Sequence, residues 1–147
     1  MDSIQARLGR PFDPAELRRI KRLWVRHSIA EDRRDIDGLI ATLAEGCVYE
    51  VVPTGRRWEG HAGARAFYTE LFAAFPDNRF ALTDIVVGPQ GVFEVATLTA
   101  TNVGPWGGAP PSGLPVALEV LILFPWDPAT ERFLGERIWF DRGALRD

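Results

Sequence analysis

The chain has 147 residues, with 17 basic and 20 acidic side chains and 46% hydrophobic residues, a composition typical of one globular domain that buries its own core. A single cysteine excludes an internal disulfide, and one cysteine with two histidines offers too few nitrogen and sulfur ligands for a typical zinc site, although carboxylates could still hold a hard cation. No apolar stretch reaches the length of a membrane span, and the first residues lack the apolar core of a signal peptide. We therefore expect a cytoplasmic protein with no membrane partner, no metal and no cofactor.

Basic residues are unevenly distributed along the chain. Arginine and lysine concentrate between residues 18 and 34, and none occurs between Arg79 and Arg132. The basic segment falls on a predicted helix whose other face is apolar, which favours a solvated helix face over a nucleic-acid-binding patch. We therefore expect no nucleic-acid partner.

The first regular element predicted is a helix over residues 14–33, which follows a loose arm over residues 1–12. Asp13 can cap this helix, Pro14 suits its first position and Glu16 suits its third. The apolar stripe of the helix continues through two polar residues, His27 and Glu31, which should therefore point inward. The apolar residues of the stripe are Leu17, Ile20, Leu23 and Trp24.

The rest of the chain predicts a few more helices and then strands. Helical spacing of apolar residues runs over residues 35–46 and again from residue 60 to Pro76, and β-branched residues predict a strand between them, over residues 47–53. Four more strands are predicted, over residues 80–87, 92–103, 116–124 and 133–140. Because helices and strands are segregated, we expect an α+β roll, in which one curved, mostly antiparallel sheet wraps the long N-terminal helix, with two further helices.

Several short segments carry a family resemblance. They are residues 58–61 before the last helix, residues 75–77 after it, the glycine- and proline-rich loop at residues 101–107 with 111–113, and residues 135–141 at the last strand. In this order and at these spacings they resemble the SnoaL-like polyketide cyclases of the nuclear transport factor 2-like superfamily, from about Leu17 onward. The resemblance implies one domain over residues 13–147, shaped as a cone whose open end holds a small apolar ligand. Because the superfamily hosts enzymes, binding modules and transport factors, the fold alone does not give the function.

The resemblance points to Asp141 as the catalytic acid or base. The cyclases carry such an aspartate on the last strand, directly after an aromatic pair, which here is Trp139 and Phe140. A carboxyl group among aromatic rings loses solvation, so it can exchange a proton with a carbon acid near neutral pH. The alternative is an aspartate at a strand end, exposed to water or paired with Arg142.

His27 is the second candidate for acid–base chemistry. It lies one helical turn before Glu31, and this spacing allows a hydrogen bond between the two side chains. A buried histidine held by a carboxylate can transfer a proton or orient a ligand carbonyl. An inward histidine can equally be a structural residue of the core, and both interpretations stay open.

Two other mechanisms known in the superfamily fit the sequence poorly. Tyr49 and Glu50 point to opposite faces of the first strand, and we expect Tyr49 to reach the cavity. Tyr49 matches a tyrosine of an epoxide hydrolase, but Val51 replaces its asparagine partner, and residues 80–131 hold no arginine for the Arg-x-Asp pair of that enzyme. Ketosteroid isomerases carry their catalytic aspartate where this chain has Val52.

Further residues are predicted to contact the ligand. Asn102 stands where the cyclases usually have a histidine, and it can form hydrogen bonds but cannot titrate. Glu119 interrupts an apolar strand, and the strand pattern leaves open whether it faces the cavity or water. Nine Phe, five Trp and two Tyr exceed the needs of a core of this size, so we assign Phe72, Trp106 and Trp139 to the cavity wall.

These observations predict a cofactor-independent cyclase or isomerase-like enzyme. Its substrate is expected to be a small apolar molecule of polyketide-like or lactone-like character, held in an aromatic-lined pocket. The alternative is a non-catalytic small-molecule-binding or dimerisation module of the same fold. We also expect a homodimer, because members of the superfamily commonly pair through the outer sheet face and Thr97, Thr99 and Thr101 share one parity of a long strand.

Overall fold

The computed structural model describes residues 2–145, which form one sheet and the helices around it. None of the helices in this range is long and apolar enough to cross a membrane. The helices are α1 (Ile4–Leu8), α2 (Pro14–Asp32), α3 (Ile36–Ile40) and α4 (Gly60–Ala74), with a short 3₁₀ helix η1 (Arg142–Leu145). The strands are β1 (Leu43–Val51), β2 (Arg56–Glu59), β3 (Arg79–Gly88), β4 (Gly91–Thr101), β5 (Pro115–Asp127) and β6 (Arg132–Phe140).

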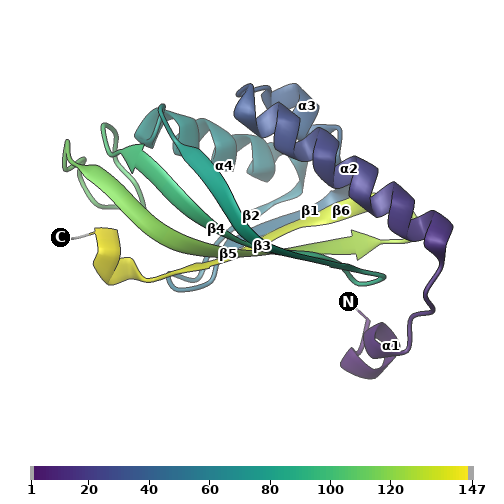
Figure 1. The fold of residues 1–147 in the computed structure, drawn as a ribbon. Helices are drawn as coiled ribbons and strands as arrows, with labels where there is room; N and C mark the ends of the chain where they lie inside the picture. The colour runs from purple at the N-terminus through teal and green to yellow at the C-terminus, as the bar shows by residue number, and fades with distance from the viewer. Residues whose placement is uncertain (1, 146–147) are drawn as a thin grey trace.

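The sheet has the strand order β2-β1-β6-β5-β4-β3. Strands β3 to β6 form an antiparallel meander and β2 pairs antiparallel with β1, whereas β1 and β6 run parallel. The sheet is curved, and α2, α3 and α4 lie over its concave side (Figure 1). The mostly antiparallel sheet and its separation from the helices confirm the predicted α+β roll.

Helix α2 supplies the apolar face that packs on the sheet. Its first turn is capped by Asp13, whose Oδ1 accepts the backbone N–H of Ala15 at 2.9 Å. Leu17 and Trp24 are half-buried and pack against the core. The inward face of this helix therefore follows the predicted stripe. Its buried residues are Ile20, Leu23, His27 and Ala30.

Two elements differ from the sequence-based expectation. The apolar pattern predicts a helix as far as residue 46, but α3 ends at Ile40 and β1 begins at Leu43. Thr42 ends the helical segment, because both its hydroxyl and its backbone N–H bond to the carbonyl of Leu39, at 2.7 and 3.0 Å. The sequence also gives no indication of β2, a four-residue edge strand, because so short a strand leaves no readable alternation.

The N-terminal arm, expected to be loose, carries α1 and contacts the sheet. Gln90 Nε2 donates to the carbonyl of Arg7 at 2.8 Å. Arg10 Nη1 donates to the carbonyls of Pro89 and Trp126, at 3.3 and 3.2 Å. Helix α1 lies on the opposite side of the sheet from α2 (Figure 1). The arm is therefore held against the turn between β3 and β4 and the end of β5.

Candidate active site

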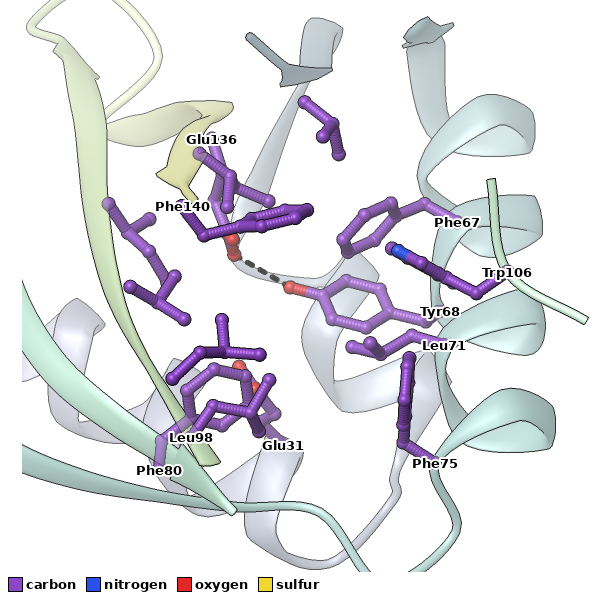
Figure 2. A pocket seen from close by; sticks show the side chains of 15 residues that line it. Glu31, Phe67, Tyr68, Leu71, Phe75, Phe80, Leu98, Trp106, Glu136 and Phe140 are labelled. Carbon is purple, nitrogen blue, oxygen red and sulfur yellow. Dashed lines mark hydrogen bonds between the residues drawn. The ribbon is translucent and has the colours of Figure 1, made fainter. Parts of the chain in front are cut away.

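A cavity of about 50 Å³ lies between α4 and the concave face of the sheet. Among its described lining residues only Glu31 and Glu136 carry a carboxyl group, and Tyr68 adds a phenol. Figure 2 shows Tyr68 reaching toward Glu136, with aromatic rings around them. The other lining residues are Val51, Phe67, Leu71, Phe75, Phe80, Leu98, Trp106, Leu118, Val120, Ile122, Ile138 and Phe140.

His27 is oriented by a chain of hydrogen bonds that ends in the backbone. Its Nδ1 lies 2.7 Å from Thr42 Oγ1, and the Thr42 hydroxyl donates to the carbonyl of Leu39 at 2.7 Å. A hydroxyl has one proton to donate, so Thr42 must accept the Nδ1–H of His27. Nδ1 is therefore the protonated nitrogen, and Nε2 is the nitrogen that can gain or lose a proton.

Nε2 of His27 faces the carboxyl group of Glu136. The atoms Nε2 and Oε1 are 3.0 Å apart, and the two side chains are only 1% and 4% exposed. At this distance one proton lies between the two acceptor atoms, on Nε2 or on Oε1. Tyr68 donates its hydroxyl proton to the same Oε1 at 2.7 Å and lies 3.1 Å from Nε2. The two residues, named here the His27–Glu136 pair, thus hold a transferable proton at the wall of an apolar cavity.

Two tyrosines support this pair. The hydroxyls of Tyr49 and Tyr68 are 2.8 Å apart, and because Tyr68 donates to Glu136, Tyr49 donates to Tyr68. Burial raises the pKa of both phenols well above the ordinary value, and the charge of Glu136 raises it further. Both tyrosines therefore remain protonated near neutral pH and act as hydrogen-bond donors.

Two more carboxyl groups lie close to the pair. Glu31 Oε2 is 3.9 Å from His27 Nε2, and Glu94 accepts the indole N–H of Trp24 at 3.0 Å. Burial raises the pKa of Glu31 well above its ordinary value, and the charges of Glu136 and Glu94 raise it further. Burial, with the charge of Glu136, raises the pKa of Glu94 to about 7. Glu94 therefore exchanges its proton near neutral pH, and Glu31 holds its proton to a higher pH than an ordinary glutamate.

Replacing Glu94 with glutamine should stabilise the fold above pH 7. The carboxyl of Glu94 has a pKa of about 7 in the folded protein, against an ordinary value of 4.5. The protonated carboxyl therefore contributes its full stability below pH 4.5, and this contribution is lost as the pH rises through 7. The full difference corresponds to at most roughly 3 kcal/mol. Glutamine keeps the acceptor for Trp24 and removes the titration.

Urea unfolding of both proteins between about pH 5 and about pH 8 measures this effect, because titration of one carboxyl changes the slope of stability against pH. The stability advantage of Glu94→Gln should grow across that range. A Glu119→Gln variant, which removes an exposed carboxyl, serves as the control and should parallel the wild type. A constant offset between Glu94→Gln and the wild type would contradict the assigned titration.

The same group of side chains has the donor set for a cation. His27, Glu31 and Glu136 each offer one ligand atom, and these atoms lie within 4.8 Å of one another. The hydrogen bond from Nδ1 of His27 to Thr42 is of the kind that orients a metal-bound imidazole. A divalent cation would have to displace the proton of the His27–Glu136 pair, so metal binding and proton storage are alternatives at this position.

Three predicted site residues lie outside the cavity. Asp141 follows the end of β6, is exposed, and accepts the backbone N–H of Gly143 at 2.9 Å. Aromatic rings do not enclose it as expected, because the alternation of β6 directs Glu136 into the cavity and residues 137, 139 and 141 away from it. Trp139 therefore lies on the outer face. Glu119 is exposed on β5, where its neighbours in the chain are the buried positions.

Three other predicted residues do lie at the site. His27 and Tyr49 belong to the hydrogen-bonded cluster around Glu136, although Tyr49 does not line the cavity as expected, because its hydroxyl is bonded to Tyr68. Trp106, from the loop between β4 and β5, lines the cavity. Its ring packs edge-on against Phe67 and Phe75, with centroids 6.1 and 5.7 Å apart. The indole thus closes the cavity beside α4.

The last two predicted residues lie behind the wall. Phe72 packs against the ring of Tyr68 at 5.6 Å and does not line the cavity. Asn102 is buried in the loop after β4, where its backbone bonds to Leu114 and Gly113. Its Oδ1 has no hydrogen-bond partner within residues 2–145. Neither residue lines the cavity.

Sequence reasoning missed Glu136 and the role of Tyr68. Glu136 alternates with Ile138 and Phe140, so it is a single acid on an otherwise apolar strand face, and this pattern could have identified it. Tyr68 stands beside the apolar face of its helix and looks like core. Nothing local indicates that the two meet, since 68 residues separate them.

The matching protein family agrees with this architecture. A family model described as SnoaL-like polyketide cyclase matches residues 17–146. The chain belongs to the SnoaL-like polyketide cyclase family. This membership confirms the resemblance noted in the sequence. No curated protein matches this SnoaL-like chain.

Solved structures share the fold of this SnoaL-like protein. A candidate SnoaL-like polyketide cyclase from Jannaschia sp. CCS1 is 24% identical, with a TM-score of 0.79 over 94% of this chain and 95% of the other. Another from Shewanella denitrificans OS-217 is 16% identical, with a TM-score of 0.75 over 92% and 96%. An NTF2-like protein of unknown function from Burkholderia pseudomallei K96243 is 16% identical, with a TM-score of 0.73 over 88% and 98%. At these identities the similarity establishes the NTF2-like fold and not the reaction.

Proposed function

We propose that this SnoaL-like protein moves a proton on a small apolar carbonyl compound, of polyketide-like or lactone-like character, without a cofactor. The observation that supports the proposal is the His27–Glu136 pair, which holds one proton at the wall of an apolar cavity. Apolar walls keep water from the reacting carbon and strengthen the hydrogen bonds inside. Glu136 takes the role that the sequence pattern suggested for Asp141.

The proposed reaction begins with the proton on Nε2 of His27 and a carboxylate at Glu136. Glu136 takes a proton from the carbon next to the ligand carbonyl, and the C–H electrons move onto the carbonyl oxygen. Nε2–H of His27 and the Tyr68 hydroxyl, which both lie beside Oε1 of Glu136, are the donors that can stabilise the resulting enolate. When the enolate is conjugated, return of the proton from Glu136 to a different carbon completes an isomerisation. When the enolate attacks a second carbonyl carbon, the oxygen of that carbonyl takes the proton from Glu136 as the ring closes, which completes a cyclisation and restores the carboxylate.

Deuterium exchange tests this proposal without knowledge of the natural substrate. A panel of cyclic ketones and lactones, from cyclopentanone and γ-butyrolactone to 2-tetralone, is incubated with the protein in D₂O and followed by NMR. We expect at least one compound to exchange the hydrogens next to its carbonyl faster than in buffer alone. If compounds bind and none exchanges faster, the protein is a binding module and the proposal fails.

We also propose that the protein is a homodimer that pairs through the outer face of its sheet. This face is opposite the helices α2, α3 and α4 (Figure 1), and it carries the half-buried side chains of Phe93 and Leu121 and, farther along β4, the exposed Thr99. We expect a dimer mass by light scattering at tens of micromolar and an interface of at least roughly 1,000 Å². Leu121→Arg should give monomers, and a monomeric wild type would contradict the proposal.

A further inference from the structure

A second, polar pocket lies on the other side of the His27–Glu136 pair. It has a volume of about 60 Å³ and lies between α2 and the strands β3 and β4. His27 and Glu31 line it together with the polar side chains of Ser28, Asp32 and Glu94, and its apolar lining residues are Trp24, Phe80, Leu82 and Phe124. The pair therefore lies between an apolar cavity that suits a ligand and a polar pocket that suits water.

The hydrogen bonds around the pair leave few routes for a proton. On one side the series of hydrogen bonds from His27 ends at a backbone carbonyl, because Thr42 donates to the carbonyl of Leu39. On another side it ends at Tyr49, which is fully buried. Within residues 2–145 neither branch continues to solvent. A ligand in the apolar cavity would cover the face of the pair that borders this cavity, which leaves the side toward the polar pocket.

Glu31 connects the two pockets. It lines both of them, and its Oε2 lies 3.9 Å from Nε2 of His27. Its side chain is 17% exposed to solvent, and within residues 2–145 its carboxyl group forms no hydrogen bond. It is therefore placed to accept a proton from either side after a small rotation.

We propose that Glu31 and Glu94 relay protons between solvent and the His27–Glu136 pair through the polar pocket, while the substrate occupies the apolar cavity. This inference rests on the proposed proton-transfer function. In each cycle a deuteron from D₂O passes by way of Glu94 and pocket water to Glu31 and on to the pair. The proton taken from the substrate leaves by the reverse path, so the charge of the site is unchanged.

The size and the electrostatics of the polar pocket support this route. A pocket of about 60 Å³ has room for a few water molecules, each of which needs about 10–15 Å³, and its carboxyl groups can hold them. Burial raises the pKa of Glu94 to about 7 and that of Glu31 well above its ordinary value. The neighbouring charges that act on Glu31 are Glu136, Glu94 and Asp32, which raise its pKa, and Arg34, which lowers it. Glu94 can therefore load and release a proton near neutral pH, and Glu31 keeps its proton to a higher pH than an ordinary glutamate.

An isomerisation in D₂O tests the relay. Cyclohex-3-en-1-one is converted to cyclohex-2-en-1-one by moving one proton, and the product records whether that proton came from the substrate or from solvent. We expect mostly deuterated product with the wild type. Glu31→Gln and Glu94→Gln should give product that keeps the original hydrogen, with a deuterium-to-hydrogen ratio lowered at least roughly tenfold. Glu119→Gln, which changes an exposed carboxyl on the outer sheet face, should match the wild type.

A second measurement needs no substrate. In histidine-labelled protein, NMR reports how fast the ring N–H protons of His27 exchange with water, and His61, the other histidine, is the internal reference. Both glutamine variants should slow exchange at His27 at least roughly tenfold and leave His61 unchanged. Faster exchange at His27 in either variant would overturn the relay.

The two measurements separate the relay from the proposed function. If the wild type isomerises the ketone and the deuterium ratio is the same in the variants, the relay is wrong and the function stands. If no isomerisation occurs and His27 exchange slows in both variants, the proton route stands and the proposed function fails. Unchanged His27 exchange in both variants overturns the relay in either case.

Discussion

Glu136→Gln should lower the rate of deuterium exchange roughly 10²–10⁴-fold, the usual effect of removing a general acid or base. Glutamine keeps the size of the side chain and can still accept the Tyr68 hydroxyl, so the cavity and ligand binding should persist. It cannot carry a proton between His27 and a ligand. NMR exchange rates in D₂O, with ligand-induced shifts as a measure of binding, report both quantities on the same samples.

Asp141→Asn is the matched control for that experiment. Asp141 is exposed and bonds to the backbone N–H of Gly143, so its amide variant should exchange at the wild-type rate. The reverse pattern, an inactive Asp141→Asn and an active Glu136→Gln, would restore the assignment that the family resemblance suggests. Equal rates in all three proteins would remove both carboxyl groups from the chemistry.

Gly135→Ala should destabilise the fold strongly, and more than Gly107→Ala. Gly135 has a φ of 99° and pairs with Val48 across the parallel strands β1 and β6. A Cβ atom there would overlap the Val48 carbonyl oxygen, so the substitution combines backbone strain with a clash between two strands. We expect the free energy of unfolding to fall by about 3 kcal/mol or more.

Gly107→Ala separates these two effects. Gly107 also has a positive φ, of 60°, but no atom lies within 4 Å of the position that a Cβ atom would take there. Its substitution should therefore cost only the strain of the left-handed conformation, about 1 kcal/mol. Urea unfolding of the two variants and the wild type measures both losses. Similar losses would show that the contact between β1 and β6 relaxes to admit the methyl group.

The outline of the fold could be predicted because it follows from local patterns. The cap at Asp13 and the stripe through Ile20 and Trp24 predict α2 nearly to its ends. The turn residues between the later segments predict where each strand of the meander begins and ends. The boundary at Leu43 could not be found in this way. Its spacing of seven residues from Ile36 continues the helical stripe, and only the hydroxyl bond from Thr42 to the carbonyl of Leu39 ends the helix before it.

The site was harder to predict because it depends on contacts between distant segments. Strand parity allowed only one of Tyr49 and Glu50 to face inward, and the helical stripe pointed His27 inward, since both patterns are properties of one element. Glu136 required the direction of β6 relative to the helices, which no local pattern supplies. The family segment drew attention to Asp141, five positions later, where the strand has already ended.

The parallel contact between β1 and β6 also has a consequence for how the chain folds. It joins Leu43 to Phe133 and Val51 to Ile138, and the His27–Glu136 pair spans 109 residues. Contacts so distant in sequence form slowly, because a long loop must close first. During synthesis on the ribosome β1 must wait, with one unpaired edge, until β6 emerges. The nascent chain is therefore most prone to aggregate at that edge, and the cluster around His27 and Glu136 is assembled only in the last folding steps.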